Sequence, residues 1–315
     1  MAQGDVRQVF IGGCDRSGTT MLGSMLGGHP AMLCLPEAQF IARTLTALPA
    51  EGPFDPSATL TSFEAHPRFQ LWRLALTQAD RAQLGRADDY EALAAGVAAL
   101  YARDNALDPG KLWIDHAPKN VAQFARLAAA FPTAKFIHMR RDGRAVANSW
   151  LPMDWGPRHI LTLADAWALA IAQGFAAEQV LGDRLLQVAY EDVVANPEAE
   201  MQRVAAFLGL PFDAGMVRAT GFKLPGHSQG THGLLTGDGA VSKQRAEAWK
   251  SGLSQRQIEL FEYHVGDLLT VLGYPLTVMA PKKPNPKEML QSHVAEVWGR
   301  AIRRTRRKKR HASTK

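Results

Sequence analysis

The chain has 315 residues, an apolar share of 46% and a formal net charge of +6, which is enough material for a sizeable α/β core. The charge is uneven, because residues 281–315 hold twelve Lys or Arg and two Glu, which leaves the rest of the chain at about −4. A nucleic-acid-binding domain normally spreads its basic residues over a folded face. The distribution therefore argues against a specific nucleic-acid partner.

Cysteine content and hydropathy bear on the compartment. The two cysteines, Cys14 and Cys34, are too few for a disulfide framework. The first ten residues lack the apolar stretch of a signal peptide, and no run of 18 consecutive apolar residues occurs. We therefore expect a cytoplasmic protein. The spacing of potential ligands matches no zinc site, so we also expect no metal.

Apolar segments alternate with helical patterns along the chain. Buried strands are expected at residues 6–13, 32–37, 111–116, 135–141 and 185–192. Helical spacing is expected at residues 19–26, through most of 40–107, and at 120–131, 143–150 and 197–208, the last begun by Pro197 and closed by Gly209. This alternation predicts a three-layer α/β domain with a central parallel sheet over residues 1–280. Residues 281–315 are expected to form a basic tail, helical or partly disordered.

The first strand ends in a loop suited to a phosphate. A strand, two glycines and a loop that opens a helix bring backbone N–H groups and the helix dipole onto one anion. The spacing from Gly13 to Thr20 fits the P-loop frame GxxxxGK[ST], except that Thr19 replaces the lysine and Arg16 supplies the cation. The loop therefore suits one 5′-phosphate with its attached group better than a triphosphate with magnesium. The alternative is a tight turn without a ligand.

The segment FIHMRRDGRAVANSW repeats the same arrangement of strand, charged Gly turn and helix. Arg141 is expected at the strand end and Ser149 two turns into the helix, where both suit a second phosphate. The alternative for this segment is a surface ion pair between Asp142 and Arg144, which contributes little.

Two segments carry a resemblance to a known family. VFIGGCDRSGTTMLGSMLGGHP resembles the 5′-phosphosulfate-binding segment of sulfotransferases that use 3′-phosphoadenosine-5′-phosphosulfate (PAPS), especially the branch of tyrosylprotein sulfotransferases and bacterial relatives. FIHMRRDGRAVANSW is similar to the 3′-phosphate motif of that family. The resemblance implies a P-loop-like fold, PAPS as co-substrate and a hydroxyl-bearing acceptor.

The resemblance also implies which residues hold the nucleotide. VAYEDVVANPEAEMQRVAAFLGLPF matches the family's Tyr-Glu-Asp strand end, although Tyr190 suits the core equally well, and VSKQRAEAWKSGLS matches a late basic loop without its family glycines. The implied nucleotide contacts are Arg16, Ser17, Gly18, Thr19, Thr20, Arg141, Ser149, Tyr190 and, in the late loop, Lys243 or Arg245.

Sulfuryl transfer needs a base for the acceptor and a cation beside the leaving oxygen. Glu37 matches the position of the family's catalytic glutamate, and Arg16 suits the leaving oxygen. His116 stands where relatives carry the lysine of Lys-Thr-Pro, so it either shares the base role or serves as a structural residue, while Lys119 offers the missing charge. Glu37 itself has an alternative as a helix-start glutamate.

Several alternatives stay open. The chain also fits a P-loop kinase of a small hydroxyl compound, or a non-catalytic binding protein with a basic tail. Within the tail, Leu290, Val294, Val297 and Trp298 have helical spacing, which indicates either core or partner packing or an anchor on an anionic membrane. Acceptor recognition is expected in residues 42–111 and 151–185 and in the Gly-rich stretch of His227 and His232. A peptide tyrosine, a sugar hydroxyl and a lipid-like acceptor all remain open.

Overall fold

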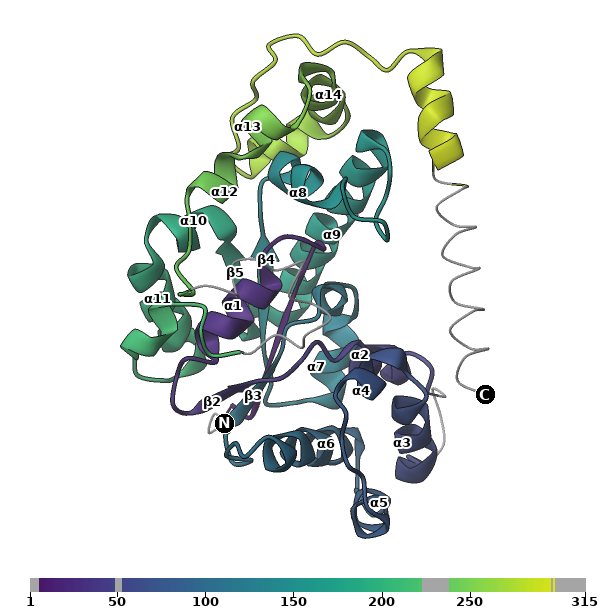
Figure 1. The fold of residues 1–315 in the computed structure, drawn as a ribbon, viewed down its shortest axis with the longest axis vertical. Helices are drawn as coiled ribbons and strands as arrows, with labels where there is room; N and C mark the ends of the chain where they lie inside the picture. Colours follow the sequence, from purple (N-terminus) through teal and green to yellow (C-terminus); the bar gives the residue numbers. More distant parts are fainter. Residues whose placement is uncertain (1–5, 49–52, 223–237, 296, 298–315) are drawn as a thin grey trace.

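A parallel sheet forms the centre of the molecule. The computed structural model describes residues 6–48, 53–222, 238–295 and 297. Its strands are β1 (Gln8–Gly13), β2 (Met32–Cys34), β3 (Leu112–Asp115), β4 (Lys135–Arg140) and β5 (Leu185–Ala189), in the spatial order β2-β3-β1-β4-β5 (Figure 1). The predicted parallel sheet is confirmed, and β1 lies at its middle.

Helices cover the sheet and extend from it. They are α1 (Thr19–Leu26), α2 (Gln39–Leu45), α3 (Pro56–Glu64), α4 (Pro67–Leu71), α5 (Gln78–Leu84), α6 (Tyr90–Asp104), α7 (Phe124–Ala130), α8 (Gly143–Trp150), α9 (Ile160–Leu181), α10 (Tyr190–Ala195), α11 (Pro197–Leu208), α12 (Gln244–Glu247), α13 (Trp249–Gly252) and α14 (Gln255–Val271), with 3₁₀ turns η1 (Pro118–Gln123), η2 (Gly182–Arg184) and η3 (Ala214–Val217). Helices α2 to α6 form an insert between β2 and β3, and a further helix spans residues 286–295.

Side chains alternate along β1 between two cores, as the two-residue period of a strand requires. Val9 and Ile11 pack with α1, α10 and α11 on one face, whereas Phe10 packs with the aromatic core that α7, α9 and the insert share on the other. The three-layer α/β prediction is therefore confirmed.

The expected helix at 120–131 differs from the prediction. Its first half is the 3₁₀ turn η1, and only Phe124–Ala130 is α-helical. Asn120 explains the difference, because its buried side-chain amide donates to the Ile11 carbonyl at 3.2 Å and to the Asp115 carboxylate at 3.0 Å. These bonds hold the backbone tightly against β1 and β3.

Helix α9 is long and apolar enough, with the residues that follow it to Arg184, to span a membrane by length and composition, and it is the one such helix in the described parts of the chain. Half of that stretch is buried inside the protein. Trp167 on α9 is fully buried against Phe261 of α14, as in a core helix.

Candidate functional site

The loop between β1 and α1 has the backbone geometry of an anion cradle. Arg16 and Gly18 have positive φ values of 71° and 104°, and the Ser17 N–H donates to the Cys14 carbonyl at 3.1 Å. Left-handed residues within such a turn point successive N–H groups to one side. A left-handed arginine is strained, and strain of this kind concentrates at functional sites.

The first N–H groups at the start of α1 have no side-chain cap. The helix has no side-chain cap at Gly18 and no acidic residue in its first turn, so none of its own side chains competes for the positive end of its dipole. Ser17 adds a hydroxyl oxygen that is buried and has no hydrogen-bond partner among the described residues. An oxyanion is the group that would satisfy both.

Arg141 follows β4 and brings a guanidinium to this loop. It donates to the carbonyls of Arg16 at 3.1 Å and Arg245 at 2.6 Å, and it stacks over the Tyr190 ring at 4.1 Å. Its Nε is buried without a partner among the described residues, and burial lowers the pKa of the guanidinium. Among the described residues, the direct contacts of the Arg141 guanidinium are carbonyls and a ring, while the charges of Glu191 and Asp142 partly offset the effect of burial on its pKa.

The two predicted anion sites adjoin each other. Arg16 Nε donates to Ser149 Oγ at 3.0 Å, which links the first loop directly to α8. Burial and the neighbouring charge of Arg141 lower the pKa of Arg16, and the charge of Arg245 adds to this effect while Asp15 opposes it. Three arginines from three segments therefore converge on one small region.

The ion pair of Asp142 and Arg144 is present but buried, so the alternative of a surface ion pair was wrong about its location. Arg144 is buried, pairs with Asp142 at 2.7 Å and Glu262 at 2.5 Å, and stacks on Trp249 at 4.0 Å. The pair fixes the start of α8 against α13 and α14, which positions Ser149 on the same helix.

The remaining predicted nucleotide contacts differ in their placement. Tyr190 begins α10, and a Cβ added at Gly18 would lie 2.7 Å from its ring, so only glycine fits there. Thr19 is buried and Thr20 is half-buried at the start of α1. The Arg245 carbonyl accepts from the Arg141 guanidinium, whereas the exposed side chain of Lys243 makes no hydrogen bond or ion pair with a described residue.

Glu37 lies just before α2 at the carboxyl end of the sheet. Its carboxylate accepts from Gln39 Nε2 at 2.5 Å and forms an ion pair with Arg68 of α4 at 3.1 Å, and 20% of its side chain is exposed. Ala38, and not Glu37, occupies the N-cap of α2. Arg68 lay in a segment without a motif, and nothing in the sequence pointed to it.

His116 is buried beside α1 and faces the same region. Its ring packs against Phe222 at 5.4 Å, and neither nitrogen has good hydrogen-bond geometry with a described residue. Burial lowers the pKa of His116, while the charge of Glu37 raises it. Burial therefore favours the neutral imidazole.

Asp115 ties these two segments together. Its fully buried carboxylate accepts from the N–H of Ala38 at 3.0 Å and from the N–H of Ala117 at 3.1 Å. Those residues directly follow Glu37 and His116, so one carboxylate fixes both candidate bases. Burial raises the pKa of Asp115 to about 6.

Asp15 is a second acid that the sequence motif did not single out. Burial raises its pKa to about 6, the charge of Lys119 lowers it, and the charge of Glu37 raises it. Lys119 thus acts electrostatically on the phosphate loop, where the sequence predicted a compensating charge. Asp15 directly precedes Arg16 in the recognised loop, so the sequence did contain a signal that could have identified this acid.

Residues 8–214 match the sulfotransferase family. The chain belongs to that family. It is 28% identical over 220 residues to the zebrafish (Danio rerio) protein-tyrosine sulfotransferase 1, with 66% of this chain and 55% of the relative aligned. It is 30% identical over 295 residues to the nodulation protein NoeE of Sinorhizobium fredii, with 84% and 65% aligned.

Solved sulfotransferase structures share the fold. The sulfotransferase domain from the Synechococcus PCC 7002 olefin synthase superposes with a TM-score of 0.62 at 22% identity, covering 88% of this chain and 98% of that domain. The P-loop-like fold prediction is thereby confirmed. The chain spans about half the length of the tyrosine sulfotransferases it matches.

Among the described residues, no group of three or more His, Cys, Asp or Glu could hold a metal ion. The predicted acceptor-site histidines, His227 and His232, and the tail residue Trp298 lie outside the described residues.

Proposed function

We propose that this sulfotransferase-family chain transfers a sulfuryl group from PAPS to a hydroxyl acceptor by in-line displacement, without a metal. The observation that carries the proposal is the Arg141 guanidinium, which lies beside the glycine loop with a buried Nε that has no hydrogen-bond partner within the described parts of the chain. A buried cation of this kind is costly unless an anion completes it. A nucleotide with both a 5′ and a 3′ anion suits two adjoining cradles, whereas a triphosphate would need the missing P-loop lysine.

Each residue has a proposed role. The backbone of residues 17–20 and the Arg16 side chain hold the 5′ group, while Arg141, Ser149 and the late loop at Lys243 or Arg245 hold the 3′-phosphate, with Tyr190 beside the nucleotide. PAPS supplies the sulfuryl group. The acceptor oxygen bonds to sulfur, the bond from sulfur to the 5′-phosphate oxygen breaks, and Arg16 stabilises the charge that grows on that oxygen.

Glu37 is the proposed base and accepts the proton of the acceptor hydroxyl. Its ion pair with Arg68 and its bond from Gln39 orient the carboxylate. His116 is the second candidate for the role, since a buried neutral imidazole is also able to accept a proton. Asp115 holds both in place through backbone bonds.

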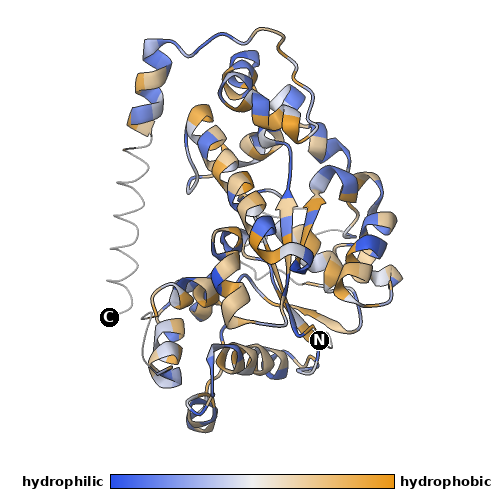
Figure 2. Cartoon of the chain, turned by 180° about the vertical axis from the view of Figure 1, so that it is seen from behind, coloured by the Kyte–Doolittle hydropathy of each residue, from blue (hydrophilic) through white to orange (hydrophobic). Residues whose placement is uncertain are grey.

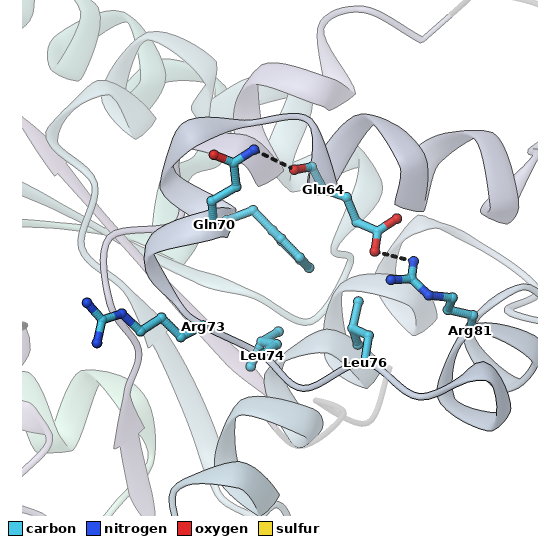
Figure 3. Close-up of a pocket in the computed structure, with 7 residues that line it drawn as sticks. Glu64, Gln70, Arg73, Leu74, Leu76 and Arg81 are labelled. Carbon is cyan, nitrogen blue, oxygen red and sulfur yellow. Dashed lines mark hydrogen bonds and ion pairs between the residues drawn. The ribbon is translucent and has the colours of Figure 1, made fainter. Parts of the chain in front are cut away.

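The acceptor is proposed to meet the α2 to α6 insert. A cavity of about 300 Å³ lies in this insert, lined by Glu64, Phe69, Gln70, Arg73, Leu74, Leu76 and Arg81. Figure 3 shows Glu64 paired with Arg81, and the Arg73 side chain directed away from the cavity. Arg68 and Phe69 are consecutive on α4, so the same short helix contacts Glu37 and lines the cavity.

Calorimetry with 3′,5′-adenosine bisphosphate tests the proposal. We expect micromolar affinity for this product and little for ATP, followed by transfer of labelled sulfuryl to peptide-tyrosine, sugar or lipid-like acceptors in a screen. Turnover of ATP with magnesium would favour the kinase alternative. The division at residues 280 and 281, the cytoplasmic address and peripheral contact with an anionic membrane stay predictions.

A further inference from the structure

The helix at residues 286–295 attaches to the body through its polar side. The Arg256 guanidinium on α14 donates to the Glu288 carboxylate through Nε and Nη2, both at 2.8 Å, and Ser292 Oγ lies 3.3 Å from Thr162 Oγ1 on α9. Glu288, Ser292 and Ala295 are half-buried, and the other described residues of this helix are exposed. Spacings of four and three residues place these three on one face.

The opposite face of this helix is apolar and faces solvent. Leu290, Val294 and Val297 follow the same four-and-three spacing, half a turn away from the attached face. The exposed fraction is 62% for Leu290, 44% for Val294, 51% for Val297 and 55% for the neighbouring Met289. A surface helix normally buries its apolar stripe, so the expectation of core packing is wrong for these side chains. Figure 2 shows the helix with both hydrophobic and hydrophilic colours at the edge of the molecule.

The charge around this stripe is positive. Lys282, Lys283 and Lys287 are exposed on or just before the helix. The sequence after it, residues 298–315, contains nine Lys or Arg and no acidic residue. A helix with an apolar face and a basic flank has the composition of a segment that lies in a membrane interface. A nucleic acid would engage the basic residues but not the apolar stripe.

We propose that the apolar side of the helix at residues 286–295, together with Val297, docks this protein on an anionic membrane surface, while its polar side stays bound to the α/β body. The basic residues supply attraction to anionic headgroups, and the apolar side chains enter the interface. Both the basic residues and the apolar side chains are needed, because either feature alone gives only weak membrane binding. The polar contacts with Arg256 and Thr162 leave the apolar face free to do this without rearranging the fold. The proposal is independent of sulfuryl transfer.

Co-sedimentation with vesicles tests it on the full chain. Wild-type protein is expected to sediment with phosphatidylcholine vesicles that contain phosphatidylglycerol and not with pure phosphatidylcholine, and less so when salt rises from about 0.1 M to about 0.5 M. The double substitution Leu290→Asp/Val294→Asp is expected to lower partitioning at least about tenfold. Val271→Asp is the matched control, because Val271 is 76% exposed at the end of α14 and should bind as wild type.

Other results would overturn the proposal. Equal binding by wild type and the double variant would mean that the apolar stripe does not enter the membrane. Binding to neutral vesicles alone would remove the role of the basic flank. A dimer that the double variant converts to a monomer, without vesicle binding, would make the stripe an interface between two copies. Affinity for RNA without vesicle binding would make the tail a nucleic-acid site. Circular dichroism and bisphosphate binding confirm that each variant is folded.

Discussion

Replacement of Arg141 by lysine should weaken nucleotide binding although it keeps the charge. A lysine has no planar fork, so it cannot hold the carbonyls of Arg16 and Arg245 while it also directs a third N–H outward. A hydrogen bond to a charged group contributes about 1.5–3 kcal/mol. The loss of one such bond to a phosphate therefore predicts a roughly ten- to 150-fold weaker affinity for 3′,5′-adenosine bisphosphate.

The matched control is Arg184→Lys. Arg184 also donates to backbone carbonyls, those of Ala128, Phe131 and Ala134, and burial also lowers its pKa, but it precedes β5 at the opposite end of the sheet. Both variants should lose some stability in urea unfolding, since both leave carbonyls without their donor. Only Arg141→Lys should lose nucleotide affinity in calorimetry. If Arg141→Lys folds and binds the bisphosphate as tightly as wild type, the assignment of Arg141 to a phosphate is refuted.

Three further substitutions separate the acids of the site. Glu37→Gln should lower turnover roughly a hundred- to ten-thousand-fold with bisphosphate affinity unchanged, whereas a near-normal rate would move the base to His116; Glu200→Gln on α11, also paired with an arginine, is the control. Burial raises the pKa of Asp15 to about 6, so this residue gains negative charge as the pH rises from 5 to 7. The ratio of bisphosphate affinity of Asp15→Asn to that of wild type should therefore rise about fivefold over that range. A ratio that does not change with pH would contradict this prediction. Asp115→Asn should lower the free energy of unfolding by about 1–3 kcal/mol in urea and also reduce turnover, and a variant with normal stability and rate would remove its positioning role.

Local sequence was sufficient to predict the strand, glycine turn and helix at residues 8–26. Gly13 lies in close contact with β4, where an added Cβ would be 2.2 Å from the Met139 carbonyl, and Gly18 requires both a positive φ and space beside Tyr190. These constraints act within one strand, turn and helix, and they leave a glycine pattern that can be read directly. The parallel sheet was equally accessible, because each strand and helix has its own periodicity.

Contacts between distant segments were not accessible in this way. The ion pair of Glu37 with Arg68 depends on how the α2 to α6 insert folds back, and no periodicity encodes it. A surface ion pair was the alternative interpretation for Arg144, because its local pattern is that of a charged helix start. It is buried only because Glu262 and Trp249, more than 100 residues later, cover it.

The missing P-loop lysine has a structural consequence for how this site forms. In a P-loop with its lysine, the loop itself carries the charge that meets the phosphates. Here the positive charge comes from Arg16 on the loop and from Arg141 after β4. The α12 segment supplies the Arg245 carbonyl, which holds Arg141 in place. The proposed anion site therefore depends on the packing of three segments that are distant in sequence, with Glu191 fixing the start of α8 through the Asp142 N–H at 3.0 Å. Nucleotide binding should accordingly stabilise the contacts among β4, α8 and α12 as well as the loop, because the same ligand would bridge all of them.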